Sequence, residues 1–159
     1  MRKLKYGISL LLSAGMLLAA NPFTGKWKMN HQKSSQTKAD TPKDENDTPK
    51  DENRVISDQG NQLVVVITGT DADGTPIAIH YIVPAGGGAG QMQQSSSYNG
   101  VSTKRVNDNT TDTMYTKDGK ELAAEHMVVS SDGQTMTVTV KGVDSDGKPV
   151  EHVLVFDKE

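Results

Sequence analysis

The sequence of 159 residues contains no cysteine, and only 4% of its residues are aromatic. Without cysteine the chain has no disulfide, no thiolate nucleophile and no zinc site of the CxxC type. Basic residues are outnumbered, since 17 Lys and Arg face 20 Asp and Glu, and the formal net charge is −3. Nucleic-acid binding depends on a basic surface that displaces counterions from phosphates. We therefore expect no nucleic-acid partner.

Long apolar runs are also missing, apart from a short one near the N-terminus. Residues 8–20 contain no charged side chain, and three basic side chains precede them. A positive segment, a short apolar stretch and small residues at Ala19 and Ala20 are typical of a secretory signal peptide. The stretch is shorter than the ~20 residues that a membrane-spanning helix needs. We expect residues 1–20 to be a cleaved signal peptide, the protein to be periplasmic or extracellular, and no stable membrane insertion afterwards.

A polar segment follows the first strand-like stretch of the mature chain. Residues 31–54 contain a single apolar residue, Ala39, and the heptapeptide DTPKDEN occurs twice in tandem at 40–53. A segment of this composition buries too little apolar surface to offset its ordering entropy. We expect residues 31–54 to form a disordered insertion within one domain that spans residues 21–159.

From Val55 onward the sequence is dominated by β-strand patterns. β-branched runs at 63–68 and 77–83, and alternation of apolar residues with threonine at 136–140, predict strands. Gln-Gly and Asp-Gly pairs punctuate these runs, and glycine adopts the positive φ that tight hairpin turns require. The glycine-rich run at 85–90 is expected to be a flexible hairpin loop or a lid over one end of the fold.

An internal repeat organises the predicted strands. Residues 55–84 align without gaps with residues 128–157, and nine of the thirty positions are identical. Two copies of this three-strand unit, a hairpin at 101–116 and a strand around Trp27 give about nine strands. An antiparallel sheet of this size avoids exposed edges by curling up. We predict an all-β, up-and-down antiparallel β-barrel, with a β-sandwich as the alternative.

Several motifs resemble the bacterial secreted lipocalin-like domain family. They are GKWKMN at 25–30, the pair Lys33-Ser34 and a closing hairpin that contains TMTVTVKG at 135–142. The resemblance implies a small, lipocalin-like antiparallel β-barrel, whereas ligands differ among members of such families. The chain departs from true lipocalins in its long first connection, and it has no C-terminal arginine placed to stack on Trp27.

We expect the barrel interior to bind or carry a small apolar or amphipathic ligand. The side chains predicted to line or floor that site are Trp27, Tyr81, His152, Leu154 and Phe156. Strand alternation puts His152 on one face with Leu154 and Phe156, and puts His126 on one face with Ala124 and Val128. Both histidines could therefore point into the barrel. The alternative for all of these residues is closed-core packing, with histidines hydrogen-bonded at the barrel rim.

No catalytic, metal or cofactor site is indicated. The motifs DADG at 71–74 and DSDG at 144–147 resemble the start of a calcium loop, but Ile82 and Val155 stand where an EF-hand has its closing glutamate. The four histidines never form HxH or HExxH. We expect a monomer that is not an enzyme and needs no metal or cofactor. The alternative function is a structural or protein-interaction module of the cell envelope.

Overall fold

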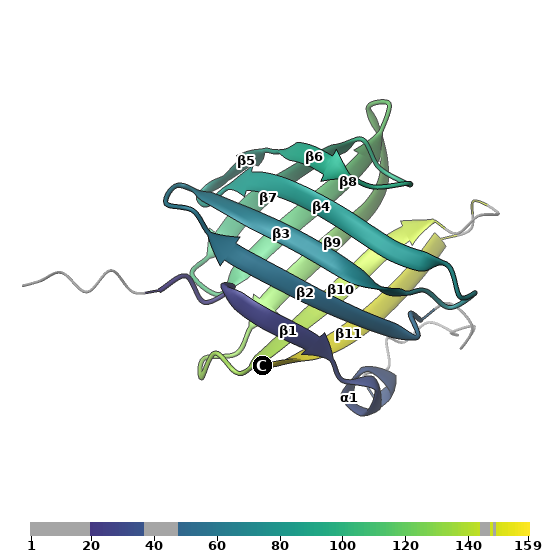
Figure 1. The fold of residues 1–159 in the computed structure, drawn as a ribbon, viewed down its shortest axis with the longest axis horizontal. Coiled ribbons are helices and arrows are strands. Elements are labelled where there is room, and N and C mark those ends of the chain that lie inside the picture. Colours follow the sequence, from purple (N-terminus) through teal and green to yellow (C-terminus); the bar gives the residue numbers. More distant parts are fainter. Residues whose placement is uncertain (1–19, 37–47, 144–146, 148) are drawn as a thin grey trace, which may run out of the picture.

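In the computed structural model of the protein, residues 20–36, 48–143, 147 and 149–159 are described. Within them, eleven antiparallel strands form a single sheet in the order β5-β7-β8-β9-β10-β11-β1-β2-β3-β4-β6. The elements are β1 (Gly25–Met29), α1 (His31–Gln36), β2 (Asp51–Asp58), β3 (Gln62–Thr70), β4 (Pro76–Pro84), β5 (Gly87–Ala89), β6 (Gln91–Gln94), β7 (Gly100–Asn107), β8 (Thr110–Lys117), β9 (Lys120–Val129), β10 (Thr135–Val143) and β11 (Pro149–Lys158). The sheet curls into a nearly closed barrel (Figure 1).

The predicted all-β antiparallel barrel is confirmed, and a β-sandwich is not what forms. The strand number differs, because the described residues contain eleven strands rather than about nine. Of the two additional strands, β5 lies in the region 85–90 that was expected to be a flexible loop or lid, and β6 directly follows it. β5 pairs with β7, and β6 pairs with β4. This one connection therefore joins the two edges of the sheet and brings the barrel close to closure.

In this connection glycine allows backbone segments to approach each other closely and does not provide flexibility. The Gly90 amide donates a hydrogen bond to the carbonyl oxygen of Val101 at 2.9 Å. A Cβ atom on Gly90 would lie 2.5 Å from Cγ1 of Val83 and 2.6 Å from the carbonyl oxygen of Ile82. Only glycine lets the backbone cross between the two edges at this separation. The prediction of a flexible loop or lid is wrong because this segment is held between the two edges of the sheet.

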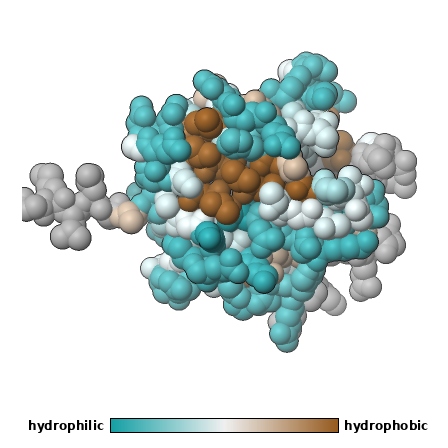
Figure 2. Space-filling view, viewed as in Figure 1, coloured by the Kyte–Doolittle hydropathy of each residue, from teal (hydrophilic) through white to brown (hydrophobic). Residues whose placement is uncertain are grey.

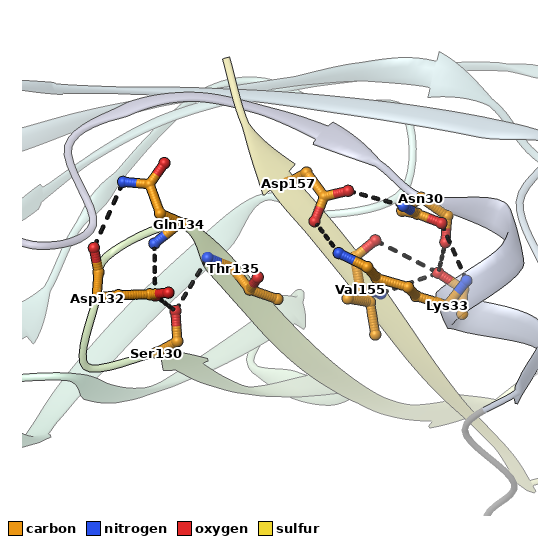
Figure 3. Close-up of polar contacts among 9 residues, drawn as sticks. Asn30, Lys33, Ser130, Asp132, Gln134, Thr135, Val155 and Asp157 are labelled. Carbon is orange, nitrogen blue, oxygen red and sulfur yellow. Dashed lines mark hydrogen bonds and ion pairs between the residues drawn. The ribbon is translucent and has the colours of Figure 1, made fainter.

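Residues 31–54 also differ from the prediction of a disordered insertion. Their first part forms α1 and their last part begins β2, while residues 37–47 lie outside the described residues. Polar contacts order α1 (Figure 3): Asn30 Oδ1 accepts the Lys33 amide at 3.0 Å, and Asn30 Nδ2 donates to Asp157 Oδ2 at 2.7 Å. The Ser34 hydroxyl oxygen accepts the Val155 amide at 2.9 Å. Composition misled here because hydrogen bonds to β11, not apolar burial, hold the helix.

The two copies of the internal repeat become β2–β3–β4 and β9–β10–β11, each a set of three neighbouring antiparallel strands. Turn glycines adopt the expected positive φ, and at the two-residue β8–β9 turn both Asp118 (52°) and Gly119 (80°) do so. Positive φ at both central residues is the geometry of a tight hairpin turn that matches the twist of the strands. The regular spacing of these turns is what made the strands predictable.

The outer face of β2, β3 and β4 carries apolar side chains as well. Val64 pairs with Ile82, and Val66 pairs with both Val55 and His80. These residues alternate with the inward-facing ones, and Val55 is 38% exposed. Figure 2 shows apolar side chains gathered in the middle of this face. We call Val55, Val64, Val66 and Ile82 the outer apolar face.

Candidate functional site

The two ends of the barrel are filled to different degrees. One end, surrounded by the β3–β4 turn and the β6–β7 loop, contains a cavity of about 280 Å³ that opens to solvent. At the other end the free space is about 20 Å³, which is room for about one water molecule. Phe23 closes that end from inside, with the Arg105 guanidinium 5.0 Å from the centre of its ring. The open end is therefore the candidate site.

The walls of the open cavity combine polar and apolar side chains from most of the barrel. Wall residues on strands include Glu52 (β2), Ile79 (β4), Tyr115 (β8), Glu125 (β9), Val140 (β10), and His152 and Leu154 (β11). The β3–β4 turn adds Asp71, and the β6–β7 loop adds Ser95, Ser96, Ser97 and Tyr98. The cavity thus has an apolar side, a row of hydroxyl groups and three carboxyl groups.

A buried ionic cluster lies beside this cavity. Arg54, 1% exposed, donates from Nη1 and Nη2 to the two carboxylate oxygens of Glu125, each at 2.8 Å. Its Nε donates to Oε1 of Glu52 at 2.6 Å. The guanidinium also lies 5.1 Å from the ring centre of Phe156. One cation is thus shared by two carboxylates, so the cluster carries one surplus negative charge when both are ionised.

The cluster follows from strand alternation on two separate strands. On β2, Glu52, Arg54 and Ile56 are buried and their neighbours are exposed. On β9 the buried residues include Ala123, Glu125 and Met127. Three strands, β10, β11 and β1, separate β2 from β9 in the sheet, so the ion pair crosses the barrel interior. Sequence analysis missed both carboxylates.

Three tyrosines surround Glu125 and Arg54. The Tyr115 hydroxyl donates to Oε2 of Glu125 at 3.2 Å and lies 3.4 Å from the hydroxyl of Tyr81. The Tyr98 ring stacks on the Tyr115 ring with centres 4.9 Å apart. Burial and the negative charge of Glu125 raise the pKa of Tyr81 to about 12 and hold the pKa of Tyr115 well above its usual range. Both phenols therefore stay neutral hydrogen-bond donors at physiological pH.

Glu52 is the least satisfied member of the cluster. Its side chain is buried, and within the described residues Arg54 is its one hydrogen-bond and ion-pair partner, through Oε1. Burial raises the pKa of the Glu52 carboxyl, while the nearby Arg54 cation opposes that shift. Its second oxygen, Oε2, is left without a described partner at the wall of the cavity. An ionised carboxylate accepts hydrogen bonds at both oxygens, so Oε2 is available to a donor in the cavity.

The structure brings two of the five predicted site residues to the cavity. His152 and Leu154 line it. Tyr81 lies deeper and contributes to the small space at the closed end, and Phe156 is fully buried beneath Arg54. Outside the cavity walls lie the other three predicted residues, Trp27, Tyr81 and Phe156. They pack in the core because the closed end of the barrel is filled.

Trp27 has a structural role at the junction of β1 and β11. Its indole Nε1 donates to the carbonyl oxygen of Phe23 at 2.8 Å. The ammonium group of Lys158 lies 5.0 Å from the centre of the indole ring, within the range of a cation–π contact. Sequence analysis looked for an arginine in this place and found none, and a lysine occupies it.

His126 points away from the barrel interior. It is exposed, and its Nδ1 lies 2.6 Å from Oδ1 of Asp112 on the neighbouring strand β8. The face of β9 expected to point inward is therefore the outer one. Since side chains alternate along a strand, a wrong choice of face exchanges every inward residue for its neighbour. That choice is why Glu125 was overlooked.

The acidic β3–β4 turn is organised by its own backbone. Asp71 Oδ1 and Asp73 Oδ1 both accept the Thr75 amide, at 2.9 and 2.7 Å. Hydrogen bonds from Thr75 and Asp71 lower the pKa of Asp73 to about 2. Across the described part of the chain, no group of three or more His, Cys, Asp or Glu side chains is placed to hold a metal ion. In the same residues no helix is long and apolar enough to span a membrane.

Comparison with known proteins shows a structural similarity and no sequence match. No protein-family model matches the sequence, and no curated protein matches it. Among solved structures, the chain is similar to a redesigned β-barrel, mFAP1, bound to DFHBI. The sequence identity is 14%, the TM-score is 0.41, and the match covers 89% of this chain and 98% of that chain. At this identity and TM-score the similarity carries no argument about function.

Proposed function

We propose that the protein binds a small amphipathic molecule in the open end of its barrel. The observation that carries the proposal is the cavity of about 280 Å³, in a barrel whose other end is filled. Its volume is close to the lower limit of about 300 Å³ that is usual for ligand pockets. A barrel that served only as a rigid module would gain stability by filling this space with side chains.

The mixed character of the walls supports an amphipathic rather than a purely apolar ligand. Ile79, Val140 and Leu154 offer an apolar surface, whereas Glu52 and the serines of the β6–β7 loop offer hydrogen-bonding groups. Arg54 and Glu125 are committed to each other and provide no free nucleophile or base, which favours binding over catalysis. On this proposal the protein is an exported, monomeric, lipocalin-like carrier without enzymatic activity.

Filling the cavity tests the proposal. Val140→Trp adds a large side chain inside the open end and should abolish binding of an amphipathic probe such as octanol. Thr139→Trp adds the same side chain to the outer face of the same strand and should leave binding unchanged. Isothermal titration calorimetry measures both variants beside the unaltered protein. Equal octanol affinity in the unaltered protein and Val140→Trp contradicts the proposal, and so does the absence of octanol binding in the unaltered protein.

The outer apolar face favours a second function, that of a protein-interaction module. Such a face on the side of a barrel is a common feature of association surfaces. In that case Val66→Lys, which places a charge in the middle of the face, should abolish association without affecting octanol binding. Sedimentation of the purified protein at several concentrations checks this. If the unaltered protein and Val66→Lys both sediment as monomers at every concentration, the protein does not self-associate through this face.

A further inference from the structure

The charges at the wall of the open cavity point to one class of ligand. Among the described wall residues, three carry carboxyl groups, Glu52, Asp71 and Glu125, and none is Lys or Arg. Arg54 is not part of the wall, and its charge is already shared by two carboxylates. With His152 as the one basic side chain among these wall residues, the carboxyl groups outnumber basic side chains three to one, which favours a cation over an anion.

Glu52 supplies an acceptor in the right place. It is 6% exposed, it lines the cavity, and its single described partner occupies only Oε1. Glu125 differs, because the guanidinium of Arg54 binds both of its oxygens and Tyr115 binds one of them again. Of the two buried glutamates that line the cavity, Glu52 therefore keeps an oxygen, Oε2, with no partner among the described residues, and a charged N–H donor would form a strong hydrogen bond to it.

The remaining walls suit the rest of such a molecule. Leu154 and Val140 provide apolar contacts for a short hydrocarbon body. The Tyr98 ring is fixed by stacking on Tyr115, and an aromatic face attracts a cation. A quaternary ammonium would have no N–H to give Glu52, whereas a primary ammonium has three.

We propose that the cavity binds a small primary ammonium compound, with its N–H group donating to Oε2 of Glu52 and its apolar body against Leu154 and Val140. This inference rests on the proposed function and names the ligand class for the same cavity. It also predicts discrimination between molecules of equal size, because octylammonium, octanol and octanoate share one hydrocarbon chain and differ only in the polar head.

Calorimetric titration with these three probes tests the inference. Octylammonium should bind about tenfold more tightly than octanol, as expected for a hydrogen bond to a charged group, and octanoate should bind most weakly. If octanol or octanoate binds as tightly as octylammonium or more tightly, the inference is wrong and the proposed function stands. If none of the three binds, both are wrong.

Two variants connect the preference to Glu52. Glu52→Gln keeps the shape of the side chain and an oxygen for Arg54 but removes the negative charge, and it should reduce the octylammonium preference over octanol to about twofold or less. Glu121→Gln removes the charge of an exposed residue on β9 and should leave the preference intact. Octanol binding and thermal unfolding serve as checks that Glu52→Gln is folded. An undiminished octylammonium preference in folded Glu52→Gln overturns the inference.

Discussion

Arg54 on β2 and Glu125 on β9 are joined by two parallel hydrogen bonds of 2.8 Å that cross the interior of the barrel. The two residues are 71 positions apart in the sequence. Their pair separates the filled part of the barrel from the open cavity, since Phe156 lies below the guanidinium and Glu125 lines the cavity wall. The depth of the cavity is therefore set by an ionic layer rather than by an apolar floor.

Removing one partner of this layer should destabilise the fold. In Glu125→Ala the buried guanidinium keeps only Glu52, and we expect the free energy of unfolding to fall by about 3 kcal/mol. Chemical denaturation measures the change. Glu121→Ala, an exposed substitution on the same strand, should change stability by less than about 0.5 kcal/mol. The triple variant Glu52→Met/Arg54→Met/Glu125→Leu leaves no unpaired charge in the layer and should recover most of the loss. If the triple variant is as unstable as Glu125→Ala, the charges themselves are required.

The crossing at Gly90 provides a second prediction. Gly90→Ala brings a methyl group against Val83 and the backbone of Ile82, and overpacking of this kind costs about 1–3 kcal/mol. Gly86→Ala is the matched control, because a Cβ atom there meets nothing within 4 Å. Thermal unfolding of the two variants should separate them. Equal stability would show that the β5–β6 connection does not hold the edges of the barrel together.

The order of α1 can be tested at a single amide. Asn30→Ala removes the cap of α1 and the hydrogen bond to Asp157, which should cost about 1 kcal/mol. The Val155 amide, which donates to the hydroxyl of Ser34, should then exchange its hydrogen faster. His31→Ala, at the exposed neighbouring position, should not change that rate. Unchanged exchange at Val155 in Asn30→Ala would contradict the role given to Asn30.

The proposed ammonium site should be sensitive to pH. Burial raises the pKa of Glu52, so its negative charge is lost at a higher pH than for an exposed glutamate. Octylammonium affinity should therefore be highest at neutral pH and should fall as pH decreases through that raised pKa, whereas octanol affinity should change little. Asp71, Glu125, His152, Tyr98 and Tyr115 also face the cavity, and Arg54 faces Glu52. Measuring octylammonium affinity against pH in His152→Gln and in Glu52→Gln separates these contributions. If the affinity of Glu52→Gln still falls at acidic pH as in the unaltered protein, the fall belongs to another group.

Much of the fold could be predicted because strand alternation and turn chemistry are local. The nine predicted strands correspond to β1–β4 and β7–β11. Of the two strands that were not predicted, β5 lies in the segment 85–90 whose glycines indicated flexibility, and β6 directly follows that segment. Glycine is required at position 90 because Val83 and Val101 lie close to it in the folded barrel. These contacts arise only on folding, so the sequence does not reveal them.

The candidate site was less predictable for the same reason. His152 and Leu154 were found from alternation on β11. On β9 both faces carry apolar residues, so alternation alone could not tell the face of Glu125 from that of His126. Glu52 and Arg54 lie in a segment with the composition of a linker, and Arg54 finds its main partner, Glu125, 71 residues away. The signal that could have found them is their alternation with Ile56 on β2.

The most direct test of ligand binding in the open cavity is a titration of the unaltered protein with octylammonium, followed in nitrogen–proton correlation spectra. We predict that amide shifts concentrate at residues around the cavity, including Glu52, Tyr98, Ala123, Val140 and Leu154. The amide signals of the residues in the outer apolar face should not shift. Shifts centred on Val64, Val66 and Ile82, or no shifts at any concentration, would contradict the account.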